Sequence, residues 1–336
     1  MAAQALFHLG MPKTGTSLLQ NVLHLATSRG PIRGVHYPAF GRNGAIAHHA
    51  LPVALRGGEG GRSPGELAGD LLADLEASPV PRQRRRISFY SSEGFANHCG
   101  LRPAPQLVEF LECVGQAMPV RAVLVLREMT SFLESMYLQS ARYGHVTQTF
   151  DAYLAPRERW WADLLAGLTL MRDRLGEAFE IRLAEPGYDV LTDFAERLSL
   201  PIDRLLHFAS RVAATNKLSW KAQIVLANLE KVEGMVGFPI DRLALVKAFQ
   251  SGLAFRDDLA SYTLYPAGTR EELAARLSQA AVDAGLAAYA QVFGPVRATD
   301  NQPRPVVIDF AALQPRDVAR LSRANRRIEA PARAAT

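Results

Sequence analysis

The sequence has little cysteine and no long hydrophobic run. Its two cysteines, Cys99 and Cys113, form neither a CxxC pair nor a metal-ligand pattern, so a disulfide framework is not expected. No stretch of about 18 uncharged apolar residues occurs, which argues against a transmembrane helix. The first residues lack the basic segment and the long apolar segment of a signal peptide. We therefore expect a soluble, cytoplasmic protein without an integral membrane segment.

Lysine is also scarce, so the positive charge of the chain comes almost entirely from arginine. The formal net charge is +5, and lysine occurs only at positions 13, 217, 221, 231 and 247. The planar guanidinium group of arginine suits the recognition of phosphate and sulfate. A mild excess of this kind favours a small anionic ligand over nucleic acid, which calls for a concentrated basic surface. We therefore expect no nucleic-acid partner.

Short apolar segments that alternate with amphipathic segments predict an α/β fold with a central parallel sheet. Strands are expected at residues 5–9, 87–91, 120–126 and 179–183. Because 48% of the 336 residues are hydrophobic, the chain can bury a large core, and we interpret residues 1–336 as one domain. The glycine-rich segment 40–64 is predicted to be a mobile lid. Residues from roughly 219 to 330 are predicted to form a helical extension.

The most informative segment joins the first expected strand to an expected helix at 16–26. Gly10 and Gly15 have the spacing of a Walker A loop, G-x-x-x-x-G-K-[ST], but Thr16 stands where that pattern requires lysine. The lysine of this segment lies earlier, at Lys13. Backbone N–H groups of such a loop, with the positive end of the following helix, can hold an oxyanion. The segment therefore predicts a phosphate- or sulfate-binding loop with a displaced lysine.

A second pattern occurs where the expected strand at 120–126 ends. Arg127 follows this strand directly, and Ser135 stands eight positions later in the next expected helix. Ligands of doubly wound sheets bind beyond the carboxyl ends of the strands. Gly10, Glu93 and Arg127 all lie at such ends by this assignment. The sequence therefore predicts that three groups of candidate site residues share one edge of the sheet.

The run Pro-Lys-Thr-Gly-Thr-Ser at 12–17, together with Arg127 and Ser135, resembles the donor-binding motifs of sulfotransferases. These are the enzymes that use 3′-phosphoadenosine 5′-phosphosulfate (PAPS), in particular bacterial members related to the carbohydrate sulfotransferases. The resemblance covers roughly residues 5–220. It implies a P-loop-like, three-layer α/β/α fold with a central parallel sheet and additional carboxyl-terminal helices.

The same resemblance implies roles for individual residues. Lys13 would lie near the oxygen that bridges the sulfate and the 5′-phosphate, and it would act in catalysis as well as in binding. The residues that would contact the 5′-phosphate and sulfate are Thr14, Gly15, Thr16 and Ser17, and those that would hold the 3′-phosphate are Arg127 and Ser135. The product would be adenosine 3′,5′-bisphosphate, and no metal ion would be required.

The acceptor must lose a proton, which calls for a base within hydrogen-bond reach. Glu93 is the leading candidate, because it follows an expected strand end and because several carbohydrate sulfotransferases use a glutamate as base. His48 is its main rival and His49 comes after it, since imidazole groups titrate near neutral pH. The sequence leaves the choice between Glu93 and His48 open.

Two other functions fit parts of the same pattern. A P-loop kinase or nucleoside triphosphatase would share the strand, loop and helix, and Glu93 could replace the magnesium-holding acid. A non-catalytic nucleotide-binding protein could keep the fold without the chemistry. For a sulfotransferase, the resemblance makes a sugar hydroxyl the first expectation for the acceptor, with amines and small molecules as alternatives. The acceptor and the oligomeric state stay open.

Overall fold

The computed structural model describes most of the chain, and it divides the chain into two compact units. The first unit comprises residues 1–129, 157–213 and 276–294, and the second comprises 130–156, 214–275 and 295–336. The residues described are 3–12, 14–28, 32, 34–57, 61–78, 87–97, 104–146, 148–185, 187–212, 218–250, 262–266, 268–290, 306–307, 316–317 and 321. The interpretation of residues 1–336 as one domain stays a prediction.

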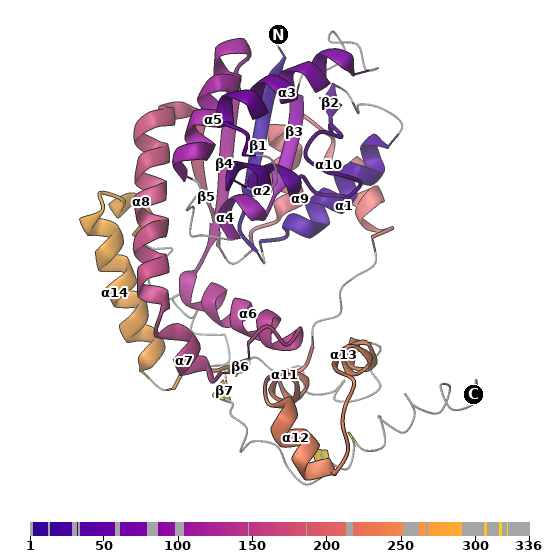
Figure 1. Ribbon diagram of the computed structural model, residues 1–336, viewed down its shortest axis with the longest axis vertical. Helices are drawn as coiled ribbons and strands as arrows, with labels where there is room; N and C mark the ends of the chain where they lie inside the picture. Colours follow the sequence, from indigo (N-terminus) through magenta and orange to yellow (C-terminus); the bar gives the residue numbers. More distant parts are fainter. Residues whose placement is uncertain are drawn as a thin grey trace. The chain divides into compact units, whose positions relative to one another are not determined.

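The first unit is built on a sheet of five parallel strands (Figure 1). The strands are β1 (Gln4–Gly10), β2 (Val35–His36), β3 (Ile87–Ser92), β4 (Val120–Arg127) and β5 (Phe179–Ala184). Their order is β2-β3-β1-β4-β5, so β1 lies at the centre. The predicted α/β class with a parallel sheet is confirmed. The short strand β2 is one that the apolar pattern does not predict, because two residues are too few to show alternation.

Helices cover both faces of this sheet, which gives the three layers expected (Figure 1). One face packs against α1 (Thr16–Thr27), α9 (Val190–Arg197) and α10 (Ile202–Ala209) through a continuous apolar core. On the other lie α3 (Pro64–Ala77), α5 (Ala104–Ala117) and α8 (Arg157–Leu175). There Phe7 of β1 stacks on Tyr90 of β3, and its ring meets Phe110 of α5 edge to face. Apart from His8, residues 5–9 of β1 are apolar, and the strand is buried on both faces.

The second unit is mainly helical. Its elements are α6 (Met129–Arg142, of which Met129 belongs to the first unit), α7 (Phe150–Leu154), α11 (Trp220–Ala227), α12 (Leu229–Val236), α13 (Arg242–Gln250), the paired strands β6 (Tyr262–Thr263) and β7 (Val306–Val307), and the first part of α14 (Thr269–Asp283). Within the predicted helical extension, α11 and α12 are separated at Asn228, whose side-chain amide donates a hydrogen bond to the carbonyl of Ile224. Asparagine competes with the helix in this way through its side chain.

The starts of two helices depend on contacts that apolar periodicity does not reveal. The helix after β4, α6, begins at Met129, and the next residue, Thr130, does not cap it. The Thr130 hydroxyl instead accepts a hydrogen bond of 2.8 Å from Nε of Arg270. In α3, Ser63 and Glu66 form a capping box that the leucine periodicity alone does not show.

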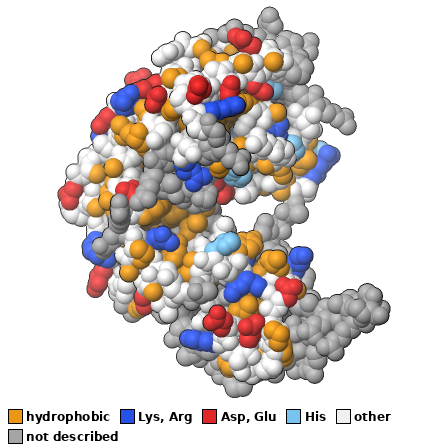
Figure 2. All heavy atoms as spheres, viewed as in Figure 1, with side chains coloured by type: hydrophobic (Ala, Val, Ile, Leu, Met, Phe, Trp, Pro, Cys, Tyr) orange, Lys and Arg blue, Asp and Glu red, His pale blue; other side chains and the backbone are white. Residues whose placement is uncertain are grey.

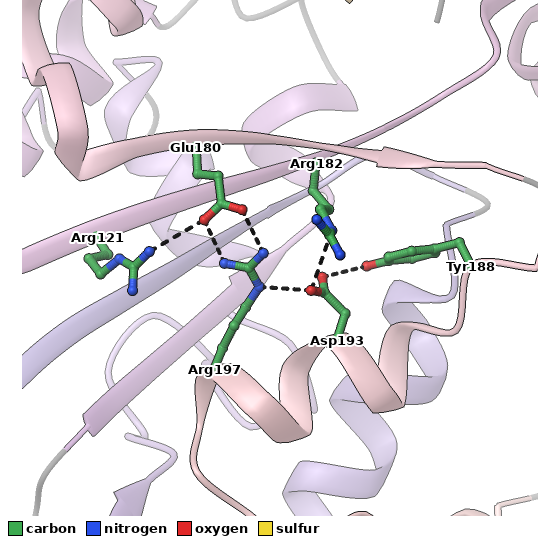
Figure 3. A network of polar contacts seen from close by, with 6 residues as sticks. All are labelled: Arg121, Glu180, Arg182, Tyr188, Asp193 and Arg197. Atoms are coloured by element: carbon green, nitrogen blue, oxygen red, sulfur yellow. Dashed lines mark hydrogen bonds and ion pairs between the residues drawn. The ribbon is translucent and has the colours of Figure 1, made fainter.

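A network of ion pairs joins β4, β5 and α9 in the first unit (Figure 3). Its members are Arg121, Glu180, Arg182, Tyr188, Asp193 and Arg197. Arg197 donates to both oxygens of Glu180 at 2.6 and 2.7 Å, and to Asp193 at 3.1 Å. The side chains of Arg197 and Asp193 are only 12% and 6% exposed. The hydrogen bonds from Arg197 lower the pKa of Glu180.

The substitution Arg197→Met is expected to lower the free energy of unfolding by about 3 kcal/mol, because it leaves two carboxylates without their shared cation. Urea denaturation at pH 7 measures this change. The matched control is Arg62→Met, which breaks an exposed ion pair with Asp70 and should cost less than about 1 kcal/mol. Equal losses in the two variants would contradict the role given to the network.

Two surface properties bear on the expected partners. None of the helices in the described part of the chain is both long and apolar enough to cross a membrane. On the face drawn in Figure 2, acidic and basic side chains lie interspersed among the coloured residues of the first unit. The positive charge is therefore not gathered into one area of that face.

Candidate functional site

Two glycines shape the loop that follows β1. Gly15 has a φ of 84°, in the left-handed region that favours glycine. A Cβ atom at Gly15 would lie 2.7 Å from Cγ1 of Val190 on α9. At Gly10, a Cβ atom would lie 2.7 Å from Oγ1 of Thr16. Both positions therefore require glycine for the close packing of β1, α1 and α9. Lys13 lies outside the described residues.

The hydroxyl groups of Thr14 and Thr16 brace this loop from inside. Both side chains are buried, and both hydroxyls lie within hydrogen-bond distance of the carbonyl oxygen of Met11, at 2.7 and 3.3 Å. In this conformation the two hydroxyls bond the turn itself. Thr14 and Thr16 can therefore donate to an anion through their backbone N–H groups. Ser17 differs from them, because it is exposed.

The amino terminus of α1 is not capped by a side chain of the loop. The helix begins at Thr16 with Gly15 as its N-cap, and Gly15 has no side chain to accept a hydrogen bond. No acidic residue stands in the first turn. The first N–H groups of a helix have no partner within the helix, and the helix dipole makes this end positive. The loop and helix together can therefore bind one phosphate or sulfate group.

Glu93 lies directly beside this loop. It follows β3, which pairs with β1 so that Leu9 is opposite Ser92. The Ser17 hydroxyl donates a hydrogen bond of 3.3 Å to Oε1 of Glu93. The structure therefore brings a carboxylate to the start of α1, across the neighbouring strand, as the sequence predicts. Its role as the base stays a prediction.

Arg127 ends β4, the neighbour of β1 on the other side. Gly10 pairs with Val125, so Arg127 extends two residues beyond the last paired residue of β1. The strand ends that carry Glu93, the loop and Arg127 are therefore adjacent, in the order β3-β1-β4. The chain also reverses direction of winding here, which is where open α/β sheets bind ligands. Ser135 lies on α6 in the second unit, and its predicted role stays a prediction.

His48 has an environment that suits structure better than proton transfer. Its side chain is 0% exposed. The Ser91 N–H lies 3.1 Å from Nδ1, and the Pro38 carbonyl lies 3.1 Å from Nε2, so one ring nitrogen accepts and the other donates. Burial lowers the pKa of His48 to about 3. We therefore assign His48 to the core beneath the site, as a residue that holds segment 38–48 against β3.

His49 is the other histidine named as a candidate base, and its role stays a prediction. It is exposed, and its Nδ1 lies 2.8 Å from Oγ of Ser92, the residue before Glu93. Oγ of Ser92 also accepts the N–H of Gly94 at 3.0 Å. His49 is thus fixed next to Glu93 with its other ring nitrogen available. The sequence signal was its position beside the start of a short helix, α2 (Ala50–Leu55), which follows it at once.

The segment predicted to be a lid is described from 40 to 57 and from 61 to 64. The N–H of His48 bonds the carbonyl of Ser91 at 2.9 Å, and the Tyr37 hydroxyl bonds the carbonyl of Ile46 at 2.9 Å. A Cβ atom at Gly94, in α4 (Gly94–Asn97), would lie 2.7 Å from Cγ of Pro52 in α2. These contacts pack 46–52 against the end of β3. Mobility of the segment stays a prediction.

No group of three or more His, Cys, Asp or Glu side chains suited to a metal ion occurs among the residues that the structure describes. The polar groups assembled at the strand ends are a positive helix terminus, an arginine, a carboxylate and a histidine. Such a set can bind an anion and accept a proton next to it.

No family model matches the chain, and no curated protein matches it. Three chains of solved structures are similar to it. One of them is a sulfotransferase from Alicyclobacillus acidocaldarius, with 16% sequence identity and a TM-score of 0.39. The alignment covers 71% of this chain and 98% of that chain. At this identity and score the similarity does not establish a family.

Proposed function

We propose that this chain is a sulfotransferase that moves the sulfuryl group of PAPS to a hydroxyl or amine of a carbohydrate or small molecule. The observation that carries the proposal is the hydrogen bond between Ser17 and Glu93. It brings a carboxylate to the anion-binding start of α1, where the sulfuryl group would leave the nucleotide and bond to the acceptor. The Walker-like loop without lysine at position 16, and Arg127 on the adjacent strand, support the same reading.

The residues present fit this donor. PAPS supplies an activated sulfuryl group on a nucleotide that carries a second phosphate. The uncapped start of α1 offers backbone N–H groups to the 5′-phosphate and sulfate. Arg127, half-buried at the end of β4, offers a bidentate guanidinium to the 3′-phosphate. The two sites follow adjacent strands, so one nucleotide could span them.

Sulfuryl transfer resembles phosphoryl transfer in its physics, because negative charge spreads over equatorial oxygens and is stabilised by positioned donors. The N–H groups at Thr16 and Ser17 would stabilise this charge. Glu93 would accept the proton of the acceptor hydroxyl as the new bond to sulfur forms. Lys13 would neutralise the oxygen of the leaving nucleotide. These roles follow from the chain's own groups and from the resemblance of its motif.

The substitution Arg127→Ala is expected to weaken the binding of adenosine 3′,5′-bisphosphate by about 10- to 100-fold, because a hydrogen bond to a charged group contributes about 1.5–3 kcal/mol. Isothermal titration calorimetry measures the affinity. The control is Arg121→Ala on the same strand, whose side chain is 49% exposed and pairs with Glu180 at 3.4 Å. Unchanged affinity in the Arg127 variant would contradict the assignment.

The direct test of the proposed function is transfer of labelled sulfate from PAPS to a set of acceptors in the presence of a chelator. Transfer that persists there supports a sulfotransferase. Transfer of labelled phosphate from ATP that stops with the chelator would support a kinase instead. Tight binding of the bisphosphate without any transfer would support a nucleotide-binding protein without catalysis.

A further inference from the structure

The positively charged side chain of Arg42 contacts neutral groups of the fold. Its Nη1 atom lies 3.0 Å from Nδ1 of His24 on α1. Its guanidinium carbon lies 5.2 Å from the centre of the Tyr37 ring. Nε of Arg42 is buried and has no hydrogen-bond partner, although the residue as a whole is only half-buried. The side chain is thus oriented by a hydrogen bond and by stacking.

Both neighbours leave the charge of Arg42 uncompensated. Burial, and then the charge of Arg42 itself, lower the pKa of His24, so its imidazole is neutral at pH 7 and accepts the hydrogen bond. Burial raises the pKa of Tyr37, whose hydroxyl donates to the Ile46 carbonyl. Within the part of the chain that the structure describes, no carboxylate pairs with Arg42. A half-buried cation without a counter-ion is costly unless a ligand supplies one.

Three other arginines of the first unit form ion pairs with carboxylates. Arg174 donates to both oxygens of Glu112, at 3.0 and 2.6 Å, and Arg197 holds Glu180 and Asp193. Arg62 pairs with Asp70 in an exposed position. These pairs neutralise their charges within the fold. The Arg42 side chain is also held in one orientation, but its contacts are with the neutral groups of His24 and Tyr37. Its positive charge can therefore pair with a bound anion.

Hydrogen bonds join the loop that carries Arg42 to the strand end that Glu93 follows. The carbonyl of Gly41 accepts the N–H of Ala50 at 3.0 Å, so Arg42 and His49 flank one backbone hydrogen bond. His49 in turn bonds Ser92, next to Glu93. Gly41 has a φ of 77°, and this left-handed turn is what returns the chain to His49. His24, which Arg42 contacts, follows Ser17 by seven residues, so the guanidinium lies about 10 Å along α1 from the residue that bonds Glu93.

We propose that Arg42 binds an anionic group of the acceptor, a carboxylate or a sulfate ester, while Glu93 receives the proton of the hydroxyl that reacts. The inference rests on the proposed function and extends it to the acceptor class. The planar guanidinium is suited to two-point contact with such an oxyanion. Neutral His24 acts as a positioning residue, because it directs the guanidinium without cancelling its charge.

The test compares matched acceptors in labelled transfer from PAPS. One arm uses hexuronate-containing oligosaccharides and the same oligosaccharides with carboxyl groups reduced to alcohols. The other uses sulfated oligosaccharides and their desulfated forms. The wild-type protein should prefer the anionic member of at least one pair by about tenfold or more in kcat/KM, mainly through KM. The two arms identify which anion Arg42 binds.

Arg42→Gln should lose about tenfold in kcat/KM for the anionic member and nothing for the neutral one. Arg42→Lys, which keeps the charge, should recover part of the preference, and Arg62→Gln should behave as wild type. Equal losses on both members would mean a structural role and would overturn the inference. So would a wild-type protein that treats both members of every pair alike.

A second readout separates this inference from the proposed function. Saturation-transfer NMR of the same oligosaccharides, with adenosine 3′,5′-bisphosphate added, requires no turnover. The anionic members should bind to the wild-type protein and lose binding in Arg42→Gln, whose melting temperature and bisphosphate affinity should be unchanged. Absence of anion-dependent binding would overturn the inference, whereas absence of bisphosphate binding and of all transfer would overturn the proposed function.

Discussion

Replacing Glu93 by glutamine is expected to lower the kcat of sulfuryl transfer by about 10²- to 10⁴-fold, which is the usual contribution of a positioned general base. Glutamine keeps the size of the side chain and an oxygen that can accept the Ser17 hydroxyl. It cannot take up the proton of the acceptor. Single-turnover transfer from labelled PAPS measures the rate, and calorimetry with adenosine 3′,5′-bisphosphate should show unchanged affinity.

The control for this experiment is Glu76→Gln, an exposed glutamate in α3, which should leave the rate as it is. Near-normal turnover in Glu93→Gln would contradict the assignment of the base. His49 would then become the group to test by His49→Phe, because it lies beside Ser92 with a ring nitrogen available. His48 would not, since both of its ring nitrogens face backbone groups.

Between pH 6 and pH 5 the free energy of unfolding is expected to fall by about 2.5 kcal/mol from two buried histidines alone. His8 and His48 are each 0% exposed, and burial lowers the pKa of each to about 3. In the unfolded chain both titrate near 6.5, so the unfolded state binds more protons over this range. Their contribution to stability is complete above pH 6.5 and is lost as the pH falls toward 3.

Urea denaturation at pH 7, 6 and 5 measures this dependence. His24 and His49, whose pKa values burial also lowers, act in the same direction. The sharper measurement is therefore a difference, in which His48→Gln should remove about 1.2 kcal/mol from the loss between pH 6 and pH 5. The control His207→Gln changes an exposed histidine of α10. A His48 variant with the same pH dependence as the parent would refute this account.

Much of the fold could be predicted from the sequence, because the signals for it are local. Apart from His8 and Arg121, the segments at 5–9 and 120–126 are apolar, and such segments form the buried strands of a parallel sheet. The glycines at 10 and 15 mark a turn that only glycine permits there. The α/β class and the parallel sheet are accordingly confirmed.

The candidate site could be predicted less completely, because neighbouring residues of one type cannot be ranked from sequence. His48 and His49 are adjacent, and sequence alone places His48 before His49 as a candidate base. The register of segment 38–50 on β3 turns His48 into the core and leaves His49 exposed beside Ser92. Arg42 also gave no signal, since its charge is significant only when its neighbours are seen to be neutral.

What the sequence determined by itself is the chemistry available along the backbone: an anion-binding turn, an arginine after one strand and a carboxylate after another. Each depends on residues within a few positions of one another. The tertiary structure alone decided which of these groups meet, because hydrogen bonds such as that of Ser17 with Glu93 join residues 76 positions apart. The order and register of the strands determine which of these residues come into contact. Order and register in turn depend on how the apolar side chains are buried on the two faces of the sheet.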